Sequence, residues 1–270
     1  MRFRIRWASA AVAAAGLLAA AATGAGRGAD GDFDQRTSAH FVLYQDVAID
    51  EAGGFHGSRR FEQQVLAELE RAYDALDRRL GLRPPRKLDV VVYDPAIFDA
   101  HFAGLFRFPA AGFYGGVIRV RGDTRLTGPL SRVLHHELVH AALDAAAPSL
   151  VVPAWVNEGG AEWFEMREAG KRGLSAGERN ALAGLARRGE LHELGALSAP
   201  SFAGMAPRAA SIAYLQSYAL IDHLARRGGE RKLAQWLAEL VRSRHLERSL
   251  RRVYRLDLAD LDAALRRELS

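Results

Sequence analysis

Two histidines and one glutamate have the spacing of a metal-dependent hydrolytic site. The segment HHELVH, residues 135–140, contains His136, Glu137 and His140 in an H-E-x-x-H pattern. On a helix, residues four apart share one face, so the two imidazoles would hold one Zn²⁺ ion. Glu137 lies one step round the helix, where it would act as general base toward a water on that ion. The neighbouring His135 points about 100° away from His136, so we do not expect it to be a ligand.

A catalytic zinc keeps three protein ligands and leaves one position for water, so a third ligand must come from elsewhere in the chain. The segment PAWVNEGGAEWFE, residues 153–165, begins with a proline that favours a helix start and carries Glu158 about one turn later. Glu162 follows four residues after Glu158 and shares its helix face. Glu158 is the first candidate for the third ligand, and Glu162 is the alternative.

The two motifs in this order resemble those of the gluzincin metallopeptidases, the thermolysin-like group of the peptidase MA superfamily. The resemblance is closest to small bacterial members of that group and covers about residues 38–245. It rests on HELVH, on a later Tyr-rich segment, and on these residues of the second motif: Trp155, Asn157, Glu158, Gly159, Ala161, Glu162 and Trp163.

The resemblance implies a role for each matching residue, with one zinc ion per chain. The zinc ligands that it implies are His136, His140 and Glu158, and the general base that it implies is Glu137. Asn157 and Glu162 match the positions that support the liganding imidazoles, because an acceptor behind an imidazole fixes its tautomer. The family often has Asp where this chain has Glu162.

Peptide hydrolysis at such a site needs one more donor for the oxyanion. The family usually takes it from a downstream Tyr or His, and the segment SIAYLQSYALIDHL contains Tyr214 and Tyr218 four residues apart. Tyr214 is our first candidate, followed by Tyr218 and then His223. A Tyr on an amphipathic helix is also a common core residue, so a purely structural role is the alternative.

A glycine-containing segment ahead of the HELVH helix is the candidate substrate-binding element. Phe113 to Val120 is rich in strand-forming residues and is interrupted by Gly115 and Gly116. In the resembled family an edge strand before the zinc helix lines the cleft, which predicts peptide binding by strand addition at Tyr114, Gly115, Gly116 and Val117. An ordinary hairpin with glycine in its turn is the alternative.

The first 25 residues predict export. Three arginines in MRFRIRW precede an apolar run over residues 8–22, and small residues follow, which is typical of a secretory signal peptide. An uncleaved N-terminal anchor is the alternative, and no other stretch is apolar enough to span a membrane.

Cleavage after Ala25 would remove three arginines and no acid, taking the net charge from +5 to +2, so we expect no nucleic-acid partner. Without cysteine there is no disulfide. We expect a bacterial periplasmic or secreted protein.

The remaining pattern predicts an α+β protein of two lobes with the zinc cleft between them. Residues 26–37 are expected to be a linker, residues 38–150 an α/β lobe that ends in the HELVH helix, and residues 151–270 a helical lobe that carries the third ligand. Strands are predicted at residues 40–44 and 88–93, on either side of a long helix through residues 61–80.

Two functional classes fit this pattern. The first is an exported zinc metallopeptidase that acts on a peptide or protein substrate. The second is a catalytically idle zinc-binding relative that binds envelope proteins or cell-wall material. Glu137 favours the enzyme, because a structural zinc site needs no general base. The pattern sets neither the substrate sequence, nor endopeptidase against exopeptidase action, nor the oligomeric state.

Overall fold

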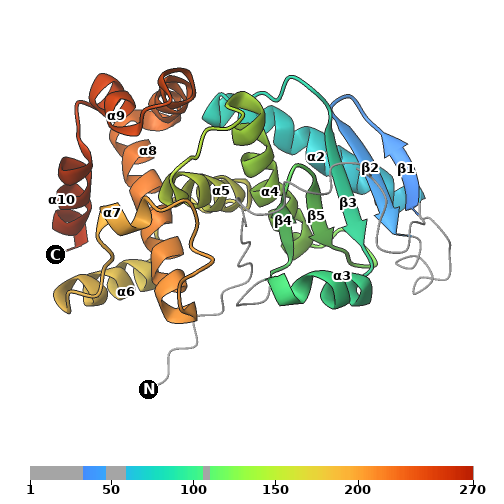
Figure 1. Cartoon of the computed structure of the whole chain (residues 1–270), viewed down its shortest axis with the longest axis horizontal. Coiled ribbons are helices and arrows are strands. Elements are labelled where there is room, and N and C mark those ends of the chain that lie inside the picture. Colours follow the sequence, from blue (N-terminus) through green and yellow to red (C-terminus); the bar gives the residue numbers. More distant parts are fainter. Residues whose placement is uncertain (1–32, 47–58, 106–109, 270) are drawn as a thin grey trace.

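The computed structural model describes residues 33–46, 59–105 and 110–269. The predicted signal segment, residues 1–25, lies outside the described residues. The fold is α+β, as predicted: a small sheet with its helices forms one end of the long axis, and helices form the other end (Figure 1). Among the described residues, no helix has both the length and the apolarity needed to cross a membrane.

A mixed five-stranded sheet forms the core of the α/β lobe, in the order β1-β2-β3-β5-β4. The two central pairs, β2 with β3 and β3 with β5, are parallel, whereas β1 and β4 run antiparallel to their neighbours at the two edges. The strands are β1 (Phe33–Thr37), β2 (Phe41–Asp46), β3 (Leu88–Tyr93), β4 (Gly112–Tyr114) and β5 (Ile118–Arg121).

The strand β1 corrects the predicted linker at residues 26–37. Phe33–Thr37 pairs along its whole length with β2, with Phe33 opposite Asp46 and Thr37 opposite Val42. The segment FDQRT has only one apolar residue, and backbone pairing at a sheet edge does not require an apolar pattern. Hydropathy therefore gave no sign of this strand.

Helices cover both faces of the sheet. Alternate residues of the central strands, such as Leu43, Val90 and Ile118, belong to the core shared with α2 (Arg59–Leu80) and α4 (Gly128–Ala146). The intervening residues form a separate aromatic cluster under α3 (Pro95–Phe102), a helix within the Phe-rich stretch of the sequence; the short 3₁₀ helix η1 (Ala103–Leu105) follows. The period of two along each strand divides the apolar residues between these two layers.

The helical lobe consists of α5 (Ala154–Glu168), α6 (Ala176–Arg187), α7 (Leu194–Leu197), α8 (Pro207–Ser243), α9 (Leu246–Tyr254) and α10 (Leu258–Leu269). The longest of these, α8, is interrupted at Gly229, where a φ of 77° breaks the helical geometry. The N-terminus of α6 has a capping box formed by Ser175 and Glu178.

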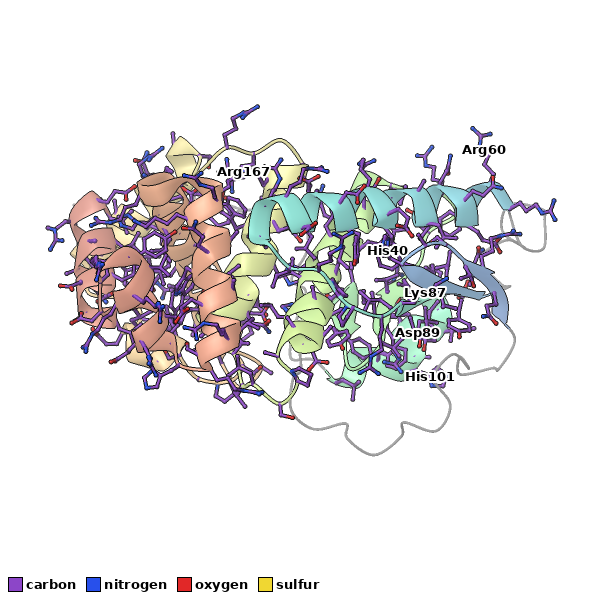
Figure 2. All side chains as sticks on the ribbon, turned by 90° about the horizontal axis from the view of Figure 1, so that it is seen from above. His40, Arg60, Lys87, Asp89, His101 and Arg167 are labelled. Atoms are coloured by element: carbon purple, nitrogen blue, oxygen red, sulfur yellow. The ribbon has the colours of Figure 1, made fainter. Side chains whose placement is uncertain are left out.

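The two lobes share one apolar core and are also linked by charge. Seen from above, α2 runs from Arg60 along the sheet toward the helical lobe (Figure 2). Near its end, Arg79 contacts Glu168, the last residue of α5, and Glu230 on α8, each at 2.7 Å. The helix stops at Gly81, whose φ of 65° suits glycine, and a Cβ atom added there would lie 3.4 Å from Ala234 Cβ. The division into lobes at residue 150 stays a prediction.

Candidate metal centre

The first motif lies in the middle of α4, as its chemistry requires. Thr127 caps this helix by accepting a hydrogen bond from the Leu130 N–H at 3.4 Å, and Pro129 occupies the first turn. Both features are typical of a helix start. Leu134 and Leu138 are fully buried on this helix, and their packing fixes the direction in which the two histidines project.

The second motif lies on α5, which packs between α4 and α8. Gly159 permits a close approach to α8: a Cβ atom there would lie 2.5 Å from the Ser217 carbonyl oxygen. This contact sets the position of the preceding residue, Glu158, which faces α4. The two motif-bearing helices, adjacent in sequence, thus lie side by side (Figure 1).

Three potential ligand atoms converge between these helices. Glu158 Oε2 lies 3.5 Å from His136 Nε2 and 3.7 Å from His140 Nε2, and all three atoms lie within 4.8 Å of one another. None of them has a hydrogen-bond partner among the described residues, and the three residues are at most 3% exposed. Buried polar atoms without partners are costly, so this arrangement calls for a further group. Two imidazoles and one carboxylate form a donor set that suits zinc.

Glu137, the candidate general base, is fully buried beside these ligands. Neither of its carboxylate oxygens has a hydrogen-bond partner among the described residues. Burial raises its pKa to about 8; His136 opposes this rise, and Glu158 adds to it. The backbone N–H of Tyr114, in the edge strand β4, also lowers the pKa of Glu137, so this carboxylate lies close to β4.

Each liganding imidazole has an acceptor behind it. His140 Nδ1 lies 2.9 Å from Asn157 Oδ1, the partner that the resemblance implied, and burial lowers the pKa of His140 to about 4. His140 is therefore neutral at pH 7, as a metal ligand must be. His136 Nδ1 lies 3.1 Å from Glu165 Oε2. The pKa of His136 is raised well above its ordinary value despite burial, because Glu158 and Glu165 face its two ring nitrogens.

Glu165 was not singled out by the sequence analysis, which assigned the supporting role to Glu162. A signal for it does exist in the sequence, because Glu165 follows Glu158 by seven residues and thus shares its helix face. Glu162 lies beside it: ligand atoms of His136, Glu162 and Glu165 are within 4.8 Å of one another. Burial, followed by the charge of Glu165, raises the pKa of Glu162 to about 8. Support of His136 by Glu162 itself stays a prediction.

The two candidate tyrosines differ in their surroundings. The Tyr214 hydroxyl is buried and has no hydrogen-bond partner within the described part of the chain, and its pKa is raised well above the ordinary value by burial and by Glu158, Glu162 and Glu137. Tyr218 instead lies under Lys171, whose Nζ is 4.3 Å from the ring centroid. The third candidate, His223, contacts Glu268 of α10 at 2.8 Å. Tyr214 is thus the candidate that the fold brings to the metal centre.

The predicted substrate-binding segment forms the hairpin β4–β5. Gly115 and Gly116 make its turn, with the Gly115 N–H donating to the Val117 carbonyl at 3.2 Å and a φ of 79° at Gly116. β4 is the edge strand next to α4, and the Tyr114 hydroxyl donates to Asp144 of α4 at 2.7 Å. The backbone of this segment is therefore a hairpin with glycine in its turn, which was the alternative prediction. Peptide binding at the edge of β4 stays a prediction.

His135 faces away from the metal centre, as its position on the helix predicted. Its Nε2 lies 2.7 Å from Glu68 of α2, and both residues are buried. This contact, opposed by burial, holds the pKa of Glu68 at about 2. The pair therefore joins α4 to α2.

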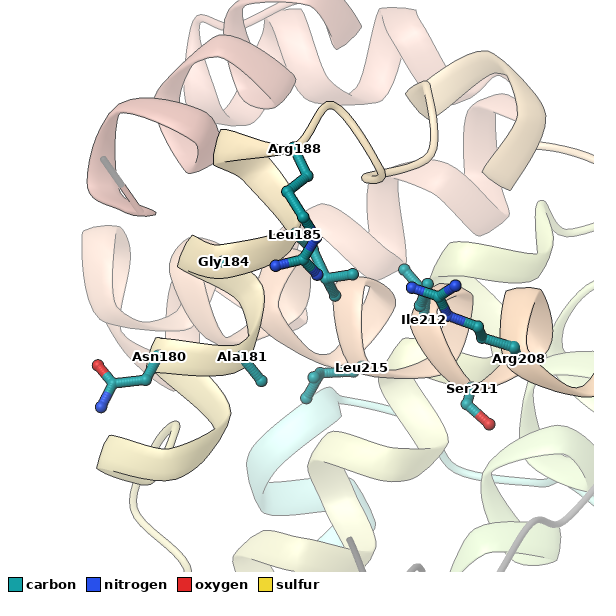
Figure 3. A pocket seen from close by; sticks show the side chains of 9 residues that line it. All are labelled: Asn180, Ala181, Gly184, Leu185, Arg188, Arg208, Ser211, Ile212 and Leu215. Carbon is teal, nitrogen blue, oxygen red and sulfur yellow. The ribbon is translucent and has the colours of Figure 1, made fainter. Parts of the chain in front are cut away.

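A separate groove of about 320 Å³ lies between α6 and the start of α8 (Figure 3). Leu185, Ile212 and Leu215 form apolar parts of its lining, and Arg188 and Arg208 contribute charge. Both arginines contact Glu190, which offsets part of that charge. None of the candidate metal ligands lines this groove.

Comparisons of the sequence with protein-family models and with curated proteins gave no match.

Proposed function

We propose that this protein is a zinc-dependent peptidase, a hydrolase that acts on peptide bonds. The observation that carries the proposal is the convergence of three buried ligand atoms, from His136, His140 and Glu158, that have no hydrogen-bond partner among the described residues, beside the buried carboxylate of Glu137. A structural zinc site would account for the three ligands but not for Glu137.

Zn²⁺ held by these three residues would polarise the substrate carbonyl and lower the pKa of a water molecule. Glu137 would take the proton from that water and deliver it to the leaving amine. The Tyr214 hydroxyl would donate a hydrogen bond to the oxygen that gains negative charge. Asn157 and Glu165 would hold the two imidazoles in the orientation and tautomer that metal binding needs.

Two further parts of the proposal rest on sequence. The strand β4 lies at an edge of the sheet next to α4, which supports substrate binding at Tyr114 to Val117 by strand addition. Export to the periplasm or the medium rests on the signal-like residues 1–25.

The test begins with the metal content of the purified full chain. We expect one zinc per chain in the wild type, loss of zinc in His140→Ala, and zinc retained without peptide cleavage in Glu137→Gln. His135→Ala is the matched control, because it removes a buried histidine from the same helix without removing a candidate ligand. A wild-type protein without zinc at neutral pH would refute the proposal.

Cleavage is measured on a denatured-protein substrate library, because the substrate sequence is not known in advance. If the wild type holds zinc but cleaves nothing, and Glu137→Gln behaves identically, the zinc-binding relative without catalytic activity becomes the better description.

A further inference from the structure

An exposed apolar loop, residues 147–153, joins α4 to α5. No charged residue occurs between Asp144 and Glu158. Val151 is 67% exposed, the highest value among the large apolar side chains of the described residues, and Leu150 and Val152 beside it are partly exposed. Val152 also packs against the core, whereas the side chain of Val151 is mostly exposed to solvent and is available to an external partner.

Four arginines lie at the corner between α8 and α9, and we call Arg242, Arg244, Arg248 and Arg252 the basic corner. Three of them surround Glu239, whose pKa is lowered first by Arg242 and then by Arg252 and Arg248. The side chains of Arg242 and Arg252 are 60% and 61% exposed. Residues 239–255 contain six arginines and two acids, Glu239 and Glu247, so the basic corner lies in a segment of net positive charge.

Arg244 brings the basic corner to the loop. Its guanidinium donates a hydrogen bond to the Pro148 carbonyl oxygen of the loop. Arg244 ends α8 in the left-handed conformation, with a φ of 55°, at a position where glycine is usually found. A residue with a side chain is less stable than glycine in this backbone conformation, and the chain nevertheless has an arginine here. The apolar loop and the basic corner are thus one continuous surface.

We propose that this surface docks on an anionic phospholipid bilayer. The loop around Val151 would enter the boundary between headgroups and acyl chains, and the basic corner would lie against the phosphates. Charge complementarity alone would also suit a soluble polyanion. The exposed apolar tip favours the bilayer, because a soluble polyanion has no apolar interior to receive it. Docking does not depend on the proposed peptidase activity.

The absence of cysteine allows a direct test at a single position. Val151→Cys of the full chain is labelled with an environment-sensitive NBD fluorophore and mixed with vesicles of phosphatidylcholine containing phosphatidylglycerol. We expect the emission to shift to the blue and to be quenched by lipid-borne quenchers. The same label on Gln63→Cys, an exposed position of α2, is the control and should stay in water. The fluorophore reports local contact, so a membrane-bound N-terminus would not imitate the result.

Neutralising the basic corner tests the electrostatic part. In the Val151→Cys background, Arg248→Gln combined with Arg252→Gln should raise the lipid concentration for half-maximal signal by roughly 25-fold, at about fivefold per arginine. Arg59→Gln combined with Arg60→Gln is matched in charge and lies at the start of α2, so it should change this concentration by less than about threefold. Circular dichroism checks that each variant is folded.

Each other outcome overturns the proposal. A label at position 151 that stays in water, whether or not the protein sediments with the vesicles, rules out insertion of the loop. Equal effects of the two double variants would mean that only net charge matters. Binding to heparin with no response to vesicles would identify a soluble polyanion as the partner. The experiment is repeated in His140→Ala, where an unchanged signal separates docking from the metal centre.

Discussion

Two adjacent glycines of α5 should respond oppositely to alanine. At Gly159 an added Cβ would lie 2.5 Å from the Ser217 carbonyl oxygen and 3.0 Å from Ile221 Cγ1. At Gly160 the nearest atom is Val139 Cγ1 at 4.0 Å, which is ordinary contact. Both residues are buried within the same helix, so the gain in helix propensity is similar for the two.

The expected magnitudes follow from these distances. Alanine in place of glycine gains about 1 kcal/mol inside a helix. For Gly159→Ala this gain is outweighed, because the α8 backbone must move by several tenths of an ångström, at about 2 to 3 kcal/mol for an overpacked site. The net loss is about 1 to 2 kcal/mol, or a Tm lower by roughly 3 to 6 °C. Gly160→Ala should instead raise the Tm by roughly 2 to 4 °C.

The assay is thermal unfolding followed by circular dichroism, with urea unfolding to obtain free energies. Zinc content is measured in both variants, so that loss of bound metal is separated from loss of packing. Equal Tm values for the two variants, or a more stable Gly159→Ala, would refute the close approach of α5 and α8 on which the position of Glu158 depends.

Three other predictions concern the metal centre and its surroundings. Glu165→Gln should weaken zinc binding by roughly tenfold or more, and Glu162→Gln by less, as measured by chelator competition; the reverse order would return the supporting role to Glu162. Tyr214→Phe should lower kcat by roughly 100-fold with little change in KM or zinc content, whereas Tyr218→Phe should leave kcat unchanged. Because the pKa of Glu68 is lowered from 4.5 to about 2, its contribution to stability is present above pH 4.5 and is lost as the pH falls toward 2. Urea unfolding at about pH 5 and about pH 2.5 should therefore show a loss in wild type that exceeds the loss in Glu68→Gln by roughly 2 to 3 kcal/mol.

Much of the fold followed from local patterns. The helix through residues 61–80 and the strand at Leu88–Tyr93 both appear where the hydropathy pattern predicted them. The strand β1 did not follow, because an edge strand is held by backbone hydrogen bonds that leave no hydropathy signal.

The sequence by itself determined the candidate ligand pair on α4 and the shared face of Glu158 and Glu162 on α5, because helical periodicity is a local property. The tertiary structure determined which of two residues about one turn apart contacts a given partner. Glu165 rather than Glu162 makes the hydrogen bond to His136, and Tyr214 rather than Tyr218 faces Glu158. Helical spacing alone does not distinguish the two residues of either pair. The packing of α5 against α4 and α8 distinguishes them, because it determines which side of each helix faces the candidate metal centre.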